Sequence, residues 1–313
     1  MKTSAILVVF ITLILITVYN PSVKPINEKR ILENKEKIEN CKSAKVTEYW
    51  ALIVGVGLYY KHPEQNRPEM LETVDYLQNE LLESNNWKPD NIHTLKGSKA
   101  TGINLIAQLF WLIRNSNEDD MVLIFITTHG SPMNYKGHPI DLPPVDEADH
   151  ADEILVMYHG FDRSFSFISD DCLNFFLSLL KAKGVCVIID SCYSGGFNDA
   201  PFFKTKILEN DISFQDYNAE SFKQGFIEDI ASQDRVVLMS TEEDSVSYSN
   251  IFSAFLIYGL WYNLADMNGN QDGINSAEEA FYFSDKMLSE QGPPGQNPTI
   301  LDLYPGEFTL TYV

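Results

Sequence analysis

Short apolar runs alternate with amphipathic stretches along the chain from Tyr49 onward. Apolar runs of about four to eight residues are typical of buried strands, whereas apolar positions three and four residues apart are typical of helices. This pattern predicts strands at 50–56, 91–95, 121–127, 185–189 and 235–240, and helices at 70–83, 101–114, 170–180 and 253–264. The alternation predicts an α/β fold in which helices flank a mostly parallel central sheet.

Two of the predicted strands, 121–127 and 185–189, are apolar without alternation, so both of their faces should be buried at the centre of the sheet. His129 lies two residues beyond the first of these strands and Cys192 three residues beyond the second. Parallel strands end at the same edge of a sheet, and neighbouring strands are about 4.8 Å apart. We therefore expect the thiol and the imidazole to meet at that edge as a nucleophile and its base.

A thiol with an unperturbed pKa of about 8.5 is mostly protonated at neutral pH, so it needs a neighbouring group that favours the thiolate. His129 is the candidate for that role. Gly130 allows a close approach of the backbone, and the N–H groups of Gly130 and Cys192 are predicted to form an oxyanion hole. Each donor of such a hole typically stabilises the transition state by about 3 kcal/mol.

Acidic residues outnumber basic ones by 44 to 23, which gives a formal net charge of −21. A polyphosphate would be repelled, so we expect no nucleic-acid partner and regard cations and basic peptides as better suited ligands. The hydrophobic content of 44% excludes a disordered chain. No feature of the sequence predicts the oligomeric state.

Residues 1–19 combine a basic start with an apolar run, which is typical of a signal peptide or a membrane anchor. The run is shorter than the roughly 20 residues that span a bilayer, and no small-residue cleavage site follows it, so cleavage and anchoring both remain open. We expect a secreted or membrane-anchored protein with its main domain outside the cytoplasm, although basic residues within 24–30 favour the opposite orientation. The composition of residues 20–45 predicts a stalk or propeptide, and residues 46–313 are predicted to form the main domain.

Several motifs of the main domain together resemble the caspase-like cysteine peptidases, and most closely the metacaspases. They are ALIVGVGLYY at the first strand, TTHG around His129, DSCYSGGF around Cys192, and VDEADHADEILV and FISDDCL between them. The 63 positions from His129 to Cys192 also fit that family. The resemblance, which runs from Tyr49 to Val313, implies a caspase-like three-layer sandwich. It also implies a cysteine endopeptidase that acts on peptides and proteins through a dyad of His129 and Cys192.

In metacaspases the residue two positions before the nucleophile lines the pocket for the P1 side chain, and here that residue is Asp190. Thr127 matches a further pocket position. A carboxylate in the pocket implies cleavage after Arg or Lys through charge-assisted hydrogen bonds. Legumains share the same motifs but have Glu at the Asp190 position and cleave after Asn, so Asn specificity is an alternative. A further alternative for the function is a non-catalytic module of the same fold that binds peptides or calcium. Asp190 itself could instead be a structural carboxylate that caps the turn following it.

Calcium-dependent metacaspases bind the ion through acidic residues at positions that match Asp152, Asp170, Asp171 and Asp199. Four carboxylates suit a hard cation that takes six to eight oxygen ligands. The resemblance therefore implies a Ca²⁺ site, while Asp170 and Asp171 could instead cap the helix that follows them.

A second calcium loop is predicted at 268–279, where the sequence resembles an EF-hand loop and Gly273 would supply the sharp turn. The predicted ligands are Asn268, Asn270, Asp272, the carbonyl of Ile274, Ser276 and Glu279. With two carboxylates the dissociation constant should be of the order of 10⁻⁴ to 10⁻³ M. A plain Asx-Gly turn is the alternative.

The stretch after Cys192 is long, polar and weakly periodic. Related enzymes often cut themselves in this region, so the resemblance implies calcium-triggered autoprocessing after a lysine. The candidate lysines are Lys204, Lys206 and Lys223.

Overall fold

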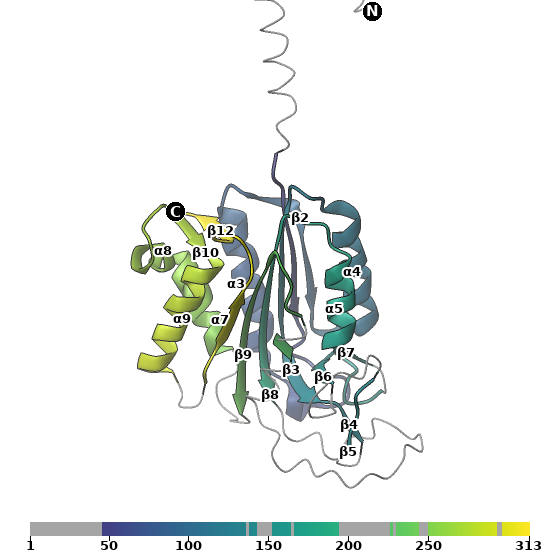
Figure 1. Ribbon diagram of the computed structural model, residues 1–313. Helices are drawn as coiled ribbons and strands as arrows, with labels where there is room; N and C mark the ends of the chain where they lie inside the picture. Colours follow the sequence, from purple (N-terminus) through teal and green to yellow (C-terminus); the bar gives the residue numbers. More distant parts are fainter. Residues whose placement is uncertain are drawn as a thin grey trace, which may run out of the picture. The chain divides into compact units, whose positions relative to one another are not determined.

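The computed structural model describes residues 46–135, 138–142, 152–163, 166–193, 226–227, 230–243, 250–292 and 296–313 (Figure 1). All of these except Val46 belong to the unit Thr47–Val313, and the other unit is Met1–Val46. The predicted N-terminal apolar segment and the stalk lie outside the described residues, as do Asp199 and the candidate lysines of autoprocessing. Within the described part of the chain, no helix is long and apolar enough to cross a bilayer.

The main sheet is mostly parallel, as predicted (Figure 1). Its strands follow the order β11-β9-β8-β3-β1-β2, in which β11 runs antiparallel to β9 and the others run parallel to one another. Their bounds are Tyr49–Gly55 (β1), Trp87–Lys96 (β2), Met121–Pro132 (β3), Gly184–Tyr193 (β8), Arg235–Glu243 (β9) and Thr299–Asp302 (β11). Because the parallel strands share a direction, their carboxyl ends lie at one edge of the sheet.

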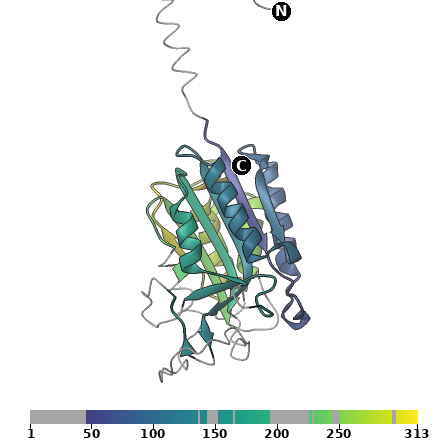
Figure 2. The ribbon, with the colours of Figure 1, turned by 90° about the vertical axis from the view of Figure 1, so that its right-hand side faces the viewer.

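Helices cover both faces of this sheet (Figures 1 and 2). On one face lie α4 (Gly102–Asn115) and α5 (Asp170–Ser178), and on the other lie α3 (Glu69–Glu83), α7 (Ile251–Trp261) and α9 (Ala277–Gln291). Alternate residues of β3 enter the two cores, so both of its faces are buried and its sequence is apolar without alternation. The α/β class and the caspase-like three-layer arrangement predicted from the sequence are confirmed.

The two central strands are longer than the sequence pattern predicts. The predicted strands end at Thr127 and Ile189, whereas β3 continues to Pro132 and β8 to Tyr193. His129 and Cys192 therefore lie inside paired strands, not two and three residues beyond them. The polar residues at these strand ends stay extended because their backbones pair with those of neighbouring strands. The strand propensity of the individual residues does not predict such pairing.

Short elements complete the fold at the two ends of the main sheet. Beyond β3, β6 (Glu153–Val156) pairs antiparallel with it and β7 (Phe167–Ser169) pairs with β6. The predicted helix at 253–264 is α7, which is followed by the separate helix α8 (Leu264–Asn268). The sequence pattern predicts neither α9 nor the pair β10 (Ile274–Ser276) and β12 (Thr309–Tyr312). The remaining elements are η1 (Pro63–Gln65), η2 (Gly97–Lys99), β4 (Asn134–Tyr135) and β5 (His138–Pro139).

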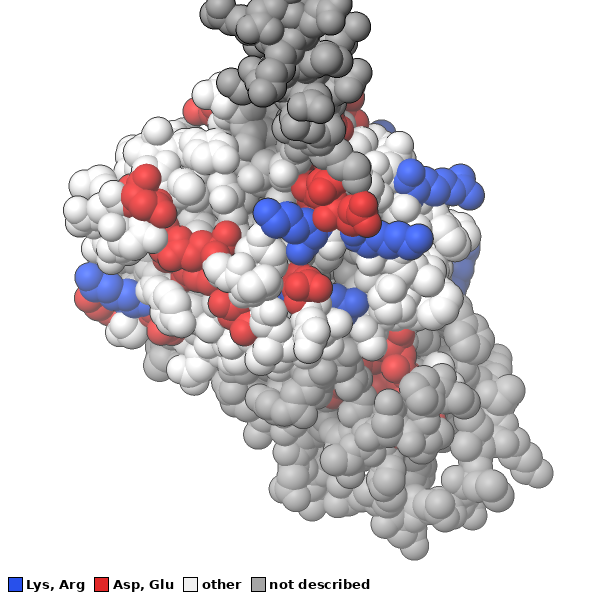
Figure 3. Space-filling model, turned by 45° about the horizontal axis from the view of Figure 1, so that its top comes forward, with Lys and Arg blue, Asp and Glu red and all other residues white. Residues whose placement is uncertain are grey.

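Charged side chains of both signs are interspersed on the face shown in Figure 3. Some surface lysines of the described residues form ion pairs with nearby carboxylates, as in the pairs of Lys61 with Asp162 and of Lys96 with Asp75. Such exposed pairs contribute about 0 to 1 kcal/mol each. The stability of the fold therefore depends mainly on the two apolar cores.

Candidate active site

The imidazole of His129 is held by the loop that follows β1. His129 is 1% exposed, and its Nε2 lies 2.8 Å from the main-chain oxygen of Gln65. Its backbone N–H donates to the hydroxyl of Tyr59 at 3.0 Å, and the Tyr59 ring stacks on the imidazole with centroids 4.9 Å apart. A carbonyl oxygen can only accept, so Nε2 carries the proton of the neutral ring and Nδ1 is the nitrogen that can take up another proton.

The sequence does not predict the residues that orient His129. Gln65 acts through its main-chain oxygen, which no side-chain motif can reveal. Tyr59 lies in an apolar run after the first strand and resembles an ordinary core residue, yet its hydroxyl also bonds Thr128 Oγ1 at 3.0 Å. Phe161 adds an edge-on contact, with ring centroids 6.0 Å apart, from a segment 32 positions further along the chain.

The structure describes Cys192 through its main chain. In the parallel pairing of β3 and β8, Cys192 is the register partner of His129, and Tyr193 is the partner of Gly130. Gly130 is flanked on its other side by Leu155 of β6. The two predicted catalytic residues therefore lie on neighbouring central strands, paired in register, near the edge of the sheet where the parallel strands end.

Asp190 and Thr127 are register partners, two residues before Cys192 and His129. Asp190 is 2% exposed, and its Oδ2 accepts hydrogen bonds from the backbone N–H of Ser253, at 3.0 Å, and from the Ser253 hydroxyl. Burial raises the pKa of the Asp190 carboxyl to about 6, although the two bonds from Ser253 lower it. Asp190 thus also caps the first turn of α7, whereas the structural alternative from the sequence concerned the turn that follows Asp190 in the chain.

Thr127 is fully buried, and its hydroxyl donates to Oδ1 of Asn250 at 2.9 Å. The Asn250 amide in turn donates to the Thr73 hydroxyl of α3 at 3.3 Å. Asn250 precedes α7 with a φ of 74°, a left-handed conformation that asparagine tolerates better than most residues. The polar side chains of Thr127 and Asp190, which precede His129 and Cys192 on their strands, therefore connect the sheet to α3 and α7.

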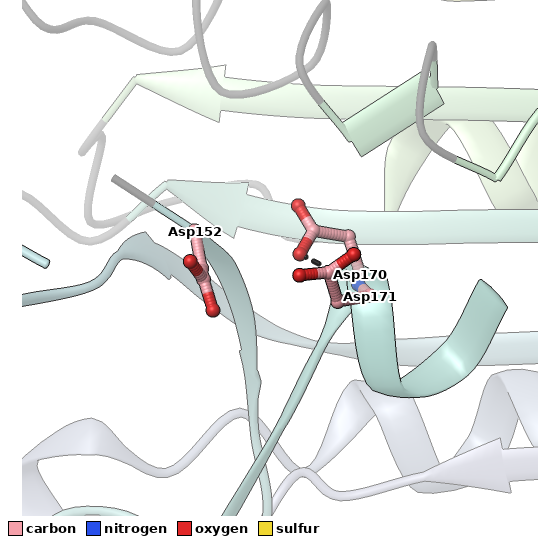
Figure 4. A group of neighbouring side chains, drawn as sticks. All are labelled: Asp152, Asp170 and Asp171. Atoms are coloured by element: carbon pink, nitrogen blue, oxygen red, sulfur yellow. Dashed lines mark hydrogen bonds between the residues drawn. The ribbon is translucent and has the colours of Figure 1, made fainter. Parts of the chain in front are cut away.

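Three of the predicted calcium ligands lie together. One carboxylate oxygen from each of Asp152, Asp170 and Asp171 lies within 4.8 Å of the other two. Figure 4 shows Asp170 and Asp171 at the start of α5 and Asp152 across from them, in the segment that leads into β6. Ser169 caps α5 by accepting from the N–H of Cys172, so Asp170 and Asp171 occupy the first turn and not the cap.

These carboxylates fit a hard cation. Oδ1 of Asp152 accepts from the N–H of Leu142 at 2.8 Å, while Oδ2 is enclosed and accepts no hydrogen bond from the described residues. The pKa of Asp152 is raised to about 7, mainly by burial and also by the charges of Asp171 and Asp141, while the bond from Leu142 lowers it. A buried carboxylate oxygen without a donor is a suitable ligand for Ca²⁺.

The predicted loop at 268–279 is stabilised by hydrogen bonds of its own. Asn268 is the last residue of α8, and its side chain donates to the carbonyl of Leu264. Glu279 accepts from the N–H groups of Asn270 and Ser276 and forms a capping box with Ser276 at the start of α9. Asp272 accepts from the N–H of Ile274. These bonds agree with an Asx-Gly turn and leave the calcium prediction for this loop untested.

Two acidic residues that the sequence does not single out also lie at this loop. Asp266 accepts from the N–H of Gly273 at 3.2 Å, and Glu307 accepts from the Asn270 amide at 3.0 Å. Burial raises the pKa of Glu307, and the charges of Glu279, Asp272 and Asp266 raise it further. Acidic groups from α8, the loop and the segment before β12 therefore repel one another here.

Comparisons with known proteins agree with this architecture. Residues 65–201 match the family model of the metacaspase, peptidase C14 domain. The crystal structure of protein GSU0716 from Geobacter sulfurreducens superposes with a TM-score of 0.51 at 15% identity, over 85% of this chain and 99% of that one. No curated protein matches the chain. At 15% identity the structural similarity supports the fold alone. The family model supports a similarity in sequence to the peptidase domain over residues 65–201. Residues 65–201 are thus similar to the metacaspase, peptidase C14 domain, within a chain that has a caspase-like α/β fold.

Proposed function

We propose that this protein is a cysteine endopeptidase in which Cys192 is the nucleophile and His129 the acid and base. The observation that carries the proposal is the register of β3 and β8, which pairs the two residues on adjacent central strands. Residues paired in register belong to the same face of a sheet. The bond from His129 Nε2 to the main-chain oxygen of Gln65 supports the same role because it leaves Nδ1 as the nitrogen that can accept a proton.

In the proposed reaction, Nδ1 of His129 takes the thiol proton and the Cys192 thiolate attacks the carbonyl carbon of the scissile bond. The N–H groups of Gly130 and Cys192 would stabilise the oxyanion that forms. His129 then returns the proton to the leaving amine as the C–N bond breaks, which leaves a thioester. Water, deprotonated by His129, attacks the thioester and releases the acid product and the thiolate.

The proposed P1 residue is Arg or Lys, bound by Asp190 with Thr127 as a further pocket residue. Asp190 lies two register rows before the reacting pair, and its Oδ1 accepts no hydrogen bond from the described residues. A buried carboxylate selects a cation because an unpaired charge is costly to bury. The same side chain caps α7, so an Asp190 variant requires a measurement of folding beside the measurement of activity.

We further propose that Ca²⁺ binds Asp152, Asp170 and Asp171 together with Asp199, which lies outside the described residues. When bound, the ion would neutralise the mutual repulsion of these carboxylates and so stabilise the segments that carry them. A second, weaker ion is proposed for the loop of Asn268, Asn270, Asp272, Ile274, Ser276 and Glu279.

Specificity for Asn at P1 is the second candidate, and it would need a cation in the pocket beside Asp190, for which we propose Arg67. The Arg67 guanidinium, two residues after Gln65, donates to the carbonyls of Asn66 and Glu64 and forms no ion pair with the described residues. A pocket that contained both this cation and Asp190 would suit an uncharged amide, which can donate to one and accept from the other.

Four fluorogenic peptides that differ only in an Arg, Lys, Asn or Asp at P1 test the proposal, each with and without Ca²⁺. Wild type is compared with Cys192→Ala and His129→Ala, and with Cys172→Ala as a matched loss of a thiol on α5. We expect the first two variants to lose activity by at least about 10³-fold and the third to retain it. Equal turnover by wild type and Cys192→Ala would exclude the thiol mechanism, whereas no turnover of any peptide by wild type would favour a non-catalytic module.

Export and autoprocessing concern parts of the chain outside the described residues and are proposed from the sequence. We propose that the N-terminal segment directs the domain out of the cytoplasm and that Ca²⁺ triggers cleavage after Lys204, Lys206 or Lys223. Mass spectrometry of the mature N-terminus tests the first point. Incubation of wild type and Cys192→Ala with Ca²⁺ tests the second, and an unchanged single band from an active wild type would contradict it.

A further inference from the structure

Three buried polar residues form a row across neighbouring strands beneath His129 and Cys192. Asp190 of β8 pairs in register with Thr127 of β3 on one side and with Ser240 of β9 on the other. The three are at most 2% exposed. Two residues along a strand span about 7 Å. The row therefore lies at the depth that a long P1 side chain would reach from the reaction centre.

Each member of this row is held by a polar residue from outside the parallel strands. Thr127 bonds Asn250, Asp190 accepts from Ser253, and the Ser240 hydroxyl accepts from Nε2 of Gln296 at 3.0 Å. The first two contacts come from the start of α7. The third comes from the segment that precedes β11, 56 positions after Ser240 in the sequence.

Gln296 differs from Asn250 and Ser253 because the oxygen of its amide has no hydrogen-bond partner among the described residues. The residue is 7% exposed, and its Oε1 is enclosed and accepts no hydrogen bond from the described residues. Buried amide oxygens are nearly always bonded, since leaving one without a donor costs free energy. The enclosed oxygen belongs to a side chain that is anchored on the strand next to Asp190.

We propose that Gln296, anchored by Ser240, is a second acceptor of the P1 pocket and makes the pocket prefer Arg over Lys. The proposal rests on the peptidase function proposed above. A guanidinium offers five N–H donors in a planar fork and can bond acceptors on two separate elements, here Asp190 Oδ1 and Gln296 Oε1. An ammonium group is compact and binds one carboxylate well without reaching the second acceptor.

The test compares kcat/KM for two peptides that differ only in Arg or Lys at P1. Gln296→Leu removes the acceptor and keeps the approximate volume, and Gln291→Leu makes the same change at an exposed position near the end of α9. We expect Gln296→Leu to lower kcat/KM for the Arg peptide roughly tenfold or more, as for a lost bond to a charged group. The Lys peptide should change by less than about threefold, and Gln291→Leu should match wild type with both peptides.

Two further variants separate contact with substrate from a structural role. Ser240→Ala removes only the anchor and should lower the Arg-to-Lys ratio in the same direction. Gln296→Glu keeps an acceptor oxygen and should retain the Arg preference. Thermal unfolding of all variants shows which of them fold. An equal loss for both peptides, or an unchanged ratio in a folded Gln296→Leu, overturns the inference while leaving the peptidase proposal intact. A wild type that hydrolyses neither peptide overturns both.

Discussion

The Nε2 atom of His129 lies 2.8 Å from the main-chain oxygen of Gln65, so the loop after β1 decides which ring nitrogen can exchange protons. That loop is held in turn by a bond from the N–H of Arg67 to the carbonyl of Gly57 at 2.8 Å. The position of the Gln65 oxygen therefore depends on backbone geometry eight residues earlier.

Gly57→Ala should disturb this arrangement. Gly57 has a φ of 54°, and a Cβ there would lie 2.7 Å from the carbonyl oxygen of Arg67. A left-handed backbone costs a non-glycine residue about 1 to 2 kcal/mol, and the collision would displace the loop that carries Gln65. We expect kcat to fall roughly 10- to 100-fold, because small misplacements of a reacting group are that costly. Rates on the best peptide substrate measure the effect.

Gly306→Ala is the matched control for that variant. Gly306 also has a positive φ, of 111°, but a Cβ there would meet nothing within 4 Å. It should lose stability through the same backbone strain and keep its kcat. Equal kcat values for Gly57→Ala and wild type would show that catalysis does not depend on the contact between the Gln65 oxygen and His129.

Tyr59→Phe should weaken both folding and activity. The variant removes the hydroxyl that accepts from the His129 N–H and bonds Thr128 Oγ1 in a buried place. A buried N–H left without an acceptor costs about 1 to 3 kcal/mol. Urea unfolding should show that loss, whereas Tyr60→Phe, at a half-buried ring, should change the free energy of unfolding by less than about 0.5 kcal/mol. Identical unfolding curves for the two variants would contradict the role of the Tyr59 hydroxyl.

The charge of Asp190 should set a pH dependence of specificity. Its pKa is raised by burial to about 6, so the pocket becomes negative as the pH rises through 6. The ratio of kcat/KM for a peptide with Arg at P1 to that for its citrulline analogue should rise across the same range, while effects of Cys192 and His129 cancel in the ratio. In Asp190→Asn the ratio should stay flat between pH 4.5 and 8. A flat ratio in wild type would exclude an Asp190 contact with the P1 cation.

The raised pKa of Asp190 should also make the free energy of unfolding decrease as the pH rises. The folded-state pKa of Asp190 lies above its model value of 3.8, so the folded protein binds the proton more tightly. Its contribution to stability is therefore present at low pH and is lost as the pH rises from about 4 to about 6. Asp190→Asn should remove this part of the pH dependence in chemical unfolding measured between pH 4 and 7, after allowance for the lost cap of α7.

Calcium should stabilise the wild type through Asp152. Asp152→Asn removes one charge from three crowded carboxylates, so the Ca²⁺-free variant should melt at or above the temperature of Ca²⁺-free wild type. It should also lose most of the rise in Tm that 1 mM Ca²⁺ produces in wild type. Asp272→Ala, in the loop before α9, should lose only the response at higher Ca²⁺ concentrations if that loop binds weakly. An undiminished response in Asp152→Asn would place the ion elsewhere.

Much of the fold could be predicted because the buried faces of strands and helices produce a local pattern of apolar residues in the sequence. The unbroken apolar runs of β3 and β8 predict central strands, and their parallel order places His129 and Cys192 at one edge. The strand ends were predicted too early, because pairing with neighbouring backbones extends them through polar residues. The sequence pattern also does not reveal the capping box that starts α9, because Ser276 and Glu279 fit the positions of a calcium loop as well.

By itself, the sequence determined the α/β class and the two central strands. It predicted a catalytic pair near the carboxyl ends of those strands, and through its resemblance to metacaspases it predicted the acidic set of Asp152, Asp170 and Asp171. The tertiary structure alone decided that the Gln65 oxygen holds His129 from 64 positions away, and that Gln296 reaches Ser240 across 56. The physical reason is that periodicity records which face of an element is buried. Register, main-chain acceptors and contacts between distant segments arise only when those faces pack together.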